Sequence, residues 1–82
     1  MNIFQVEVAA PMGRAIREVA IPSDIKIDGM MVPEVLDLIF RYGQNEIQPR
    51  LGRASVSVDD TIYYGNGARF RVEAFGFSPI TD

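Results

Sequence analysis

The chain contains no cysteine, no histidine and no tryptophan among its 82 residues. Cysteine and histidine supply the usual ligands of zinc, iron–sulfur clusters and haem, so we expect no bound metal ion and no cofactor. The same absence excludes thiol chemistry, the serine–histidine triad and the disulfide framework that small secreted domains often need. We therefore expect a protein without a catalytic site.

A surplus of positive charge is also absent. Lys and Arg together number 8 against 11 Asp and Glu, which gives a formal net charge of −3, and Lys26 is the single lysine. Proteins that bind duplex DNA are usually basic, because neutralising phosphates supplies most of their affinity. A nucleic acid is therefore disfavoured as the partner.

Long apolar runs are missing as well. No stretch reaches the roughly 18 apolar residues that a membrane-spanning helix requires, so we expect no membrane partner. The segment 1–7 lacks a basic region and reaches Glu7 early, unlike a signal peptide. These features predict a cytoplasmic location.

What is present is typical of one small globular domain spanning residues 1–82. Hydrophobic residues make up 48% of the chain and charged residues 23%. Alternating apolar and polar residues over 4–8 predict a half-buried strand. A turn containing Pro11 and Gly13 leads into a second strand over 14–21, where Ile16 falls out of phase and predicts a bulge or a late start.

The clearest predicted element is a helix over about residues 33–42. Pro33 suits the first helical position, and Glu34 places a carboxylate in the positive first turn. Asp37 and Arg41 lie four residues apart and can form an ion pair, while Gly43 supplies a left-handed cap. Apolar residues at helical spacing define the buried side: Val32, Val35, Leu36, Ile39 and Phe40.

The second half of the chain is typical of antiparallel strands. Segment 55–58 alternates as a strand, and the Asn66-Gly67 pair predicts a tight hairpin turn between strands 61–64 and 68–74. Residues 23–29 form either a short edge strand or an ordered loop, and residues 44–52 form a loop. The expected fold is α+β, with one helix packed on a curved antiparallel sheet of four or five strands. A half-open barrel is its most specific form.

Two segments of the second half resemble the YodL-like domains encoded by phages, plasmids and conjugative elements. The likeness rests on the Ser55–Val58 strand, the following Asp60 and the final Gly76-Phe77, and it covers roughly residues 32–80. It implies an origin on a mobile element, a small adaptable binding fold and no settled enzymatic activity. The cytoplasm would then be that of the host cell.

The chain departs from the YodL-like pattern at two positions. Asp59 stands where a glycine or another small residue is usual, and Thr61 stands where valine is common. Aspartate tolerates positive φ better than most side chains, so the turn can keep its geometry. The adjacent carboxylates Asp59 and Asp60 could hold Mg²⁺, but a turn in which Asp bonds its own backbone is the favoured interpretation.

Two groups of side chains are candidate partner-binding residues. Those in loop 44–52 and just after it offer an adaptable polar surface, against the alternative of a merely solvated loop. In the central hairpin, alternation turns Arg69 and Arg71 away from Phe70. Tyr63 and Tyr64 are adjacent in their strand, so one of them must face outward beside these arginines. The candidates are Gln44, Asn45, Arg50, Arg53, Tyr63, Tyr64, Arg69 and Arg71.

The leading hypothesis is a non-catalytic protein-binding module of a phage or plasmid. Its partner would be a host or element-encoded protein, and its most specific form is an anti-CRISPR type inhibitor of a host defence protein. One alternative is a single-stranded nucleic-acid adaptor that uses the curved sheet. Another is a structural homo-oligomer in which an exposed strand edge, Asn2 to Ala9, pairs with its twin.

Overall fold

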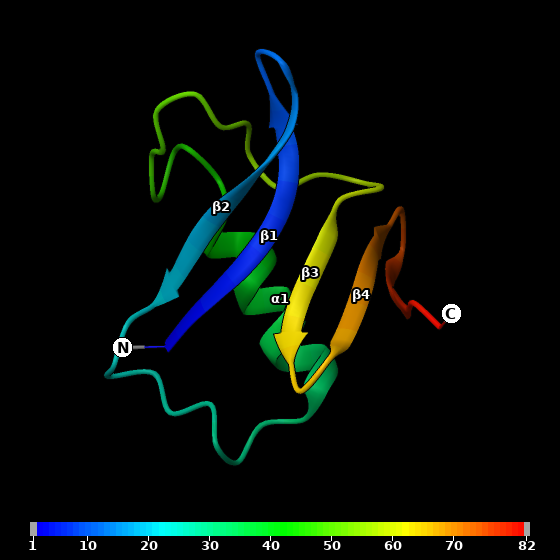
Figure 1. Cartoon of the computed structure of the whole chain (residues 1–82). Helices are drawn as coiled ribbons and strands as arrows, with labels where there is room; N and C mark the ends of the chain where they lie inside the picture. The colour runs from blue at the N-terminus through cyan, green and yellow to red at the C-terminus, as the bar shows by residue number, and fades with distance from the viewer. Residues whose placement is uncertain (1, 82) are drawn as a thin grey trace.

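The computed structural model describes residues 2–81. A long hairpin, β1 (Asn2–Ala10) and β2 (Gly13–Ile21), precedes the helix α1 (Val32–Tyr42). Three shorter strands follow: β3 (Thr61–Gly65), β4 (Ala68–Glu73) and β5 (Gly76–Pro79). All neighbouring strands are antiparallel, in the order β2-β1-β3-β4-β5 (Figure 1). This arrangement confirms the α+β prediction, and the sheet is not closed because its order ends at β2 and β5.

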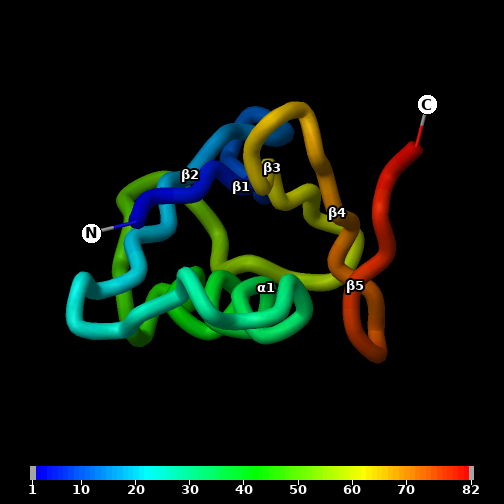
Figure 2. Tube along the Cα trace, turned by 90° about the horizontal axis from the view of Figure 1, so that it is seen from below, coloured from blue at the N-terminus to red at the C-terminus, as the bar shows by residue number. Residues whose placement is uncertain are grey.

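The elements form two layers, with α1 beneath one face of the sheet (Figure 2). Within residues 2–81 no helix covers the opposite face, which we call the open face. Apolar side chains from one face of the strands meet one side of the helix, as alternation and helical spacing predict. The buried core consists of Val6, Val8, Val19, Ile21, Val35, Leu36, Ile39, Val56, Ile62 and Val72.

The helix begins where its first turn is satisfied by a side chain. The Glu34 carboxylate accepts a hydrogen bond from the Met31 N–H at 3.0 Å, and Pro33 lies in the first turn. No ion pair joins Asp37 to Arg41 within the described part of the chain. Asp37 is therefore an exposed carboxylate with no charged partner among residues 2–81.

The predicted left-handed cap at Gly43 is wrong. Gly43 has φ −81° and ψ 8°, which any residue can adopt. Glycine is needed there for space, because a Cβ at this position would overlap Val56 Cγ2 and lie 2.9 Å from the Ile39 carbonyl oxygen. The Val56 N–H also donates to the Gly43 carbonyl at 3.0 Å, which holds the two backbones close together.

We expect Gly43→Ala to lower the free energy of unfolding by about 1–2 kcal/mol, because the added methyl group overpacks the contact with Val56. Chemical denaturation of the two proteins measures the change. Gly29→Ala is the matched control, since a Cβ at Gly29 meets no atom within 4 Å. Equal losses in the two variants would contradict the close approach.

Strand β2 contains no bulge. It pairs with β1 without a break from Asn2 opposite Ile21 to Ala10 opposite Gly13. Arg17, rather than Ile16, occupies the inward position in phase with the core valine at 19, and only 2% of Arg17 is exposed. The expected bulge is wrong because a buried arginine takes the place that an apolar residue was expected to fill.

Two other expectations are wrong, and a third, left open between two alternatives, is decided by the structure. Residues 55–58 form no strand. The Ala54 N–H donates to the Ala9 carbonyl of β1, whereas the Val56 N–H donates to the Gly43 carbonyl at the end of α1, so this segment does not pair with one strand. Strand β1 is not an edge, since it pairs with β2 on one side and with β3 over Gln5–Glu7 on the other. Residues 22–31 form an ordered loop, which resolves the ambiguity over 23–29.

The tight turns follow the predicted chemistry. Asn66 and Gly67 have φ of 53° and 80°, the left-handed values that a two-residue hairpin turn needs. Asp59 has φ 77°, so the turn beside it does use the positive φ that aspartate tolerates. A further turn at Ala74 and Phe75 starts β5, which bends the chain back along β4.

Candidate functional site

A buried guanidinium anchors the loop of residues 44–54 to the sheet. Arg17 Nη1 donates to Asn45 Oδ1 and to the Ala54 carbonyl, both at 2.9 Å, and Nη2 donates to the Gln48 carbonyl. Burial lowers the pKa of Arg17, and the positive charge of Arg50 lowers it further. Guanidinium groups stay charged in proteins, so these three acceptors offset part of the cost of removing the charge from water.

The same loop closes the outer edge of β2. Gln48 uses its amide as a strand residue would, accepting from the Ala20 N–H at 2.8 Å and donating to the Ala20 carbonyl at 2.7 Å. Arg53 Nε donates to the Ile16 carbonyl at 2.8 Å. Backbone groups that an edge strand would otherwise present to solvent are therefore bonded within the chain.

The loop candidates divide into inward and outward groups. Gln44 donates to the Phe40 and Val56 carbonyls at 2.8 and 3.0 Å, and Asn45 Nδ2 donates to the Arg53 carbonyl at 2.9 Å. These two amides hold the loop together. Arg50 and Arg53 have bonds to backbone carbonyls and to Gln48 but no ion pair with a carboxylate within residues 2–81.

Asp60 is a structural carboxylate. It is 2% exposed, accepts from Arg14 Nη2 at 2.7 Å and accepts from the Ser57 N–H at 2.9 Å. Its neighbour Asp59 is exposed and donates its N–H to the Val72 carbonyl at 2.8 Å. In the described residues no group of three or more Asp, Glu, His or Cys side chains is placed to hold a metal ion. The turn interpretation of the acidic pair is the one that these contacts support.

The hairpin candidates fall on opposite faces of the sheet. Tyr64 packs on the helix side, with its ring 5.6 Å from Phe4 in a stacked arrangement and 5.7 Å from Phe70 edge to face. Tyr63 faces the other way. It lies in a row across three strands, between Gln5 of β1 and Arg69 of β4.

A second row lies beside the first on the open face. Thr61 is flanked by Glu7 of β1 and by Arg71 of β4, and Arg71 is exposed. The open face also carries two large apolar side chains, Ile3 and Ile16, which are 56% and 40% exposed. The half-buried Tyr63 and Arg69 and the exposed Arg71 therefore lie on the open face with exposed apolar residues, whereas Tyr64 does not.

Arg17 is the most important residue that the sequence interpretation missed. The signal was available, because alternation in β2 places position 17 on the same side as Val19 and Ile21.

No helix among residues 2–81 has the length and apolar character that crossing a bilayer requires. Comparisons of the chain with protein-family models, curated proteins and solved structures give no match.

Proposed function

We propose that this chain is a protein-binding module that acts without catalysis, by covering a site on another protein with the open face of its sheet. The observation that carries the proposal is the position of Tyr63. It lies in the middle of an uncovered face, between Gln5 and Arg69. Tyrosine and arginine are the residues most often found to dominate binding energy at protein interfaces.

The rest of the open face has the composition of such an interface. Ile3 and Ile16 add exposed apolar surface, and the charges of Glu7 and Arg71 lie in the row next to Tyr63. A central aromatic residue with apolar and charged neighbours combines hydrophobic burial with electrostatic selection of the partner. The proposal includes the half-open barrel, since a sheet curved around α1 would present its convex side to the partner.

The resemblance to YodL-like domains supports a narrower form of the proposal. On that basis the module comes from a phage or plasmid and works in the host cytoplasm. Its target is a host protein, with a defence protein of the CRISPR type as the most specific candidate. A module of this size would inhibit by occupying a surface that the target needs.

We expect Tyr63→Ala to weaken partner binding about 30-fold, the loss that follows from removing an anchor worth roughly 2 kcal/mol. Calorimetric titration with the partner protein, identified by a pull-down with the parent protein as bait, measures the change in affinity. Tyr63→Phe keeps the ring and should bind within a few-fold of the parent. Arg41→Ala, on the exposed side of α1, is the surface control.

Each variant must also keep its melting temperature, so that lost binding reports the surface rather than the fold. Unchanged affinity of Tyr63→Ala for the partner would show that the open face is not the binding surface. If the captured partner is single-stranded nucleic acid, binding will instead weaken steeply with salt, which would favour the adaptor alternative.

A further inference from the structure

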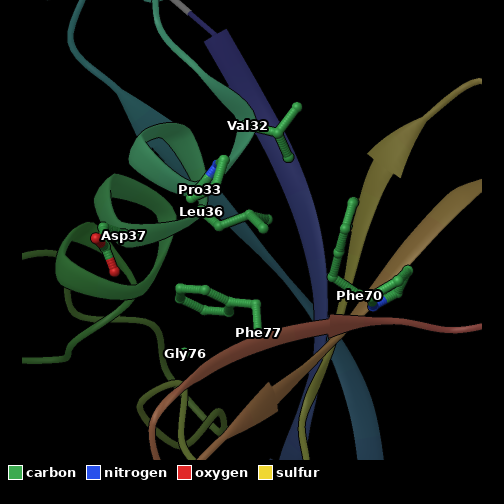
Figure 3. Close-up of a pocket in the computed structure, with 8 residues that line it drawn as sticks. Val32, Pro33, Leu36, Asp37, Phe70, Gly76 and Phe77 are labelled. Carbon is green, nitrogen blue, oxygen red and sulfur yellow. The ribbon is translucent and has the colours of Figure 1, made fainter.

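An apolar groove lies between the helix and the far end of the sheet (Figure 3). Its volume is about 470 Å³, and side chains from α1, β4 and β5 form its walls. Figure 3 shows Leu36 and Phe77 directed into the space between the helix and β5. Its lining includes Val32, Leu36, Asp37, Phe70, Phe77 and Pro79.

The charged side chain that lines the groove is acidic. Asp37 lines it, and a smaller adjoining hollow of about 150 Å³ is lined by Asp37, Phe40 and Glu73. Asp37 has no ion pair within residues 2–81, and Glu73 accepts only from the Ser78 hydroxyl, at 2.8 Å. A suitable occupant therefore has a bulky apolar side chain next to positive charge.

The chain itself carries such a group at the tip of loop 44–54. The Leu51 side chain is completely exposed, at 102% of its reference area. Arg50 and Arg53 flank it, and their hydrogen bonds go to carbonyl and amide oxygens rather than to carboxylates. We call residues 50–53 the tip. The tip offers one apolar anchor and two cations that no carboxylate of the described residues 2–81 neutralises.

We propose that the tip of one copy docks in the groove of a second copy. Leu51 enters the apolar space between α1 and β5, while Arg50 and Arg53 face Asp37 and Glu73. The groove is lined by the first turns of α1 and by β5. In Figure 1 these segments lie on the other side of the molecule from loop 44–54. The tip therefore cannot fill the groove of its own chain.

Such a contact is heterologous, because the two copies use different surfaces. Each copy keeps a free groove at one end and a free tip at the other, so association continues head to tail instead of stopping at a dimer. The contact is small, which makes the association weak and concentration-dependent. Because the arginines and carboxylates lie at the rim, the association decreases as salt increases.

Two single variants separate the surfaces. Leu51→Asp disables the tip and leaves the groove intact, while Asp37→Arg reverses the charge of the groove and leaves the tip intact. Both positions are exposed, so the fold should tolerate the changes. Met12→Asp, at another fully exposed apolar residue, and Asp24→Arg, at another exposed acid, are the matched controls.

Sedimentation velocity from about 10 µM to about 1 mM tests the proposal, a range suited to a weak contact. The average mass of the parent protein should rise with concentration, as should that of both controls. Leu51→Asp and Asp37→Arg should each remain monomeric. Their equimolar mixture should form a one-to-one dimer and nothing larger, because it contains one intact tip facing one intact groove.

Three results would overturn the proposal: a monomeric parent at the highest concentration, self-association of either single variant, or no dimer in the mixture. The test is independent of the proposed function, because Tyr63 lies on the open face. Tyr63→Ala should self-associate as the parent does. Loss of self-association in that variant would instead show that copies meet through the open face.

Discussion

Replacing Arg17 by methionine should lower the free energy of unfolding by about 2–4 kcal/mol. The substitution keeps much of the volume but leaves the carbonyls of Gln48 and Ala54 without the guanidinium donor, while Asn45 Oδ1 keeps only the Arg50 N–H at 3.2 Å. Removing a buried cation returns part of this loss, because the parent protein bears the cost of desolvating the guanidinium. In a domain of this size the melting temperature should fall by roughly 10–25 °C.

Thermal and chemical denaturation measure the effect, and hydrogen exchange locates it. The Ala20 N–H, which donates to Gln48, should exchange faster once the loop is released from β2. Arg17→Lys should also be destabilised, because an ammonium group cannot present the guanidinium fork to the same acceptors. Arg41→Met is the exposed control, and equal stability of the Arg17 and Arg41 variants would show that the anchor is not needed.

Replacing Asp60 by alanine should cost about 2–3 kcal/mol. The carboxylate is buried and accepts from both Arg14 Nη2 and the Ser57 N–H. Its removal leaves the Ser57 N–H without an acceptor and leaves Arg14 Nη2 only the Glu7 carbonyl at 3.1 Å. The loss is limited because the Arg14 side chain is 43% exposed, and water can solvate it again. The resulting turn should be looser where the chain enters β3.

The adjacent carboxylate provides the control. Asp59 is exposed, and asparagine also tolerates its φ of 77°, so Asp59→Asn should change stability by less than about 0.5 kcal/mol. Urea denaturation of the two variants makes the comparison. Similar losses at 59 and 60 would contradict the assignment of the structural role to Asp60 alone.

The elements that local pattern could predict are those whose contacts are close in sequence. Helical spacing located α1, and Asn66-Gly67 located the turn between β3 and β4. Both signals depend on residues only a few positions apart. The cap at Gly43 was predicted from the same local chemistry and was wrong, because the constraint there comes from Val56, which lies across the loop.

Most of the candidate site depends on contacts that no local pattern contains. Arg17 bonds to acceptors 28, 31 and 37 positions further along the chain. An arginine on the apolar side of a strand normally indicates a break in the alternating pattern, because burying a cation is costly unless its donors are satisfied. Segment 55–58 alternates as a strand does. However, this part of the chain bonds to Ala9 near the end of β1 and to Gly43 at the end of α1, which do not offer the row of backbone groups that a strand pairs with.

The open face was predictable in part. Alternation correctly separated Arg69 and Arg71 from Phe70 and required one outward tyrosine. It could not decide between Tyr63 and Tyr64, because the register shifts between Tyr63 and Gly65 and because the rings of Phe4 and Phe70 select Tyr64. The proposed partner-binding roles of these residues stay predictions.

The central claim is that the open face binds another protein, and a tagged pull-down from bacterial lysate tests it most directly. The parent protein, Tyr63→Ala and Arg41→Ala serve as baits, each with and without nuclease, and mass spectrometry identifies what is captured. We expect one stoichiometric protein that survives nuclease, is retained by Arg41→Ala and is lost with Tyr63→Ala. Capture that is equal for all three baits, or that disappears with nuclease, would contradict it.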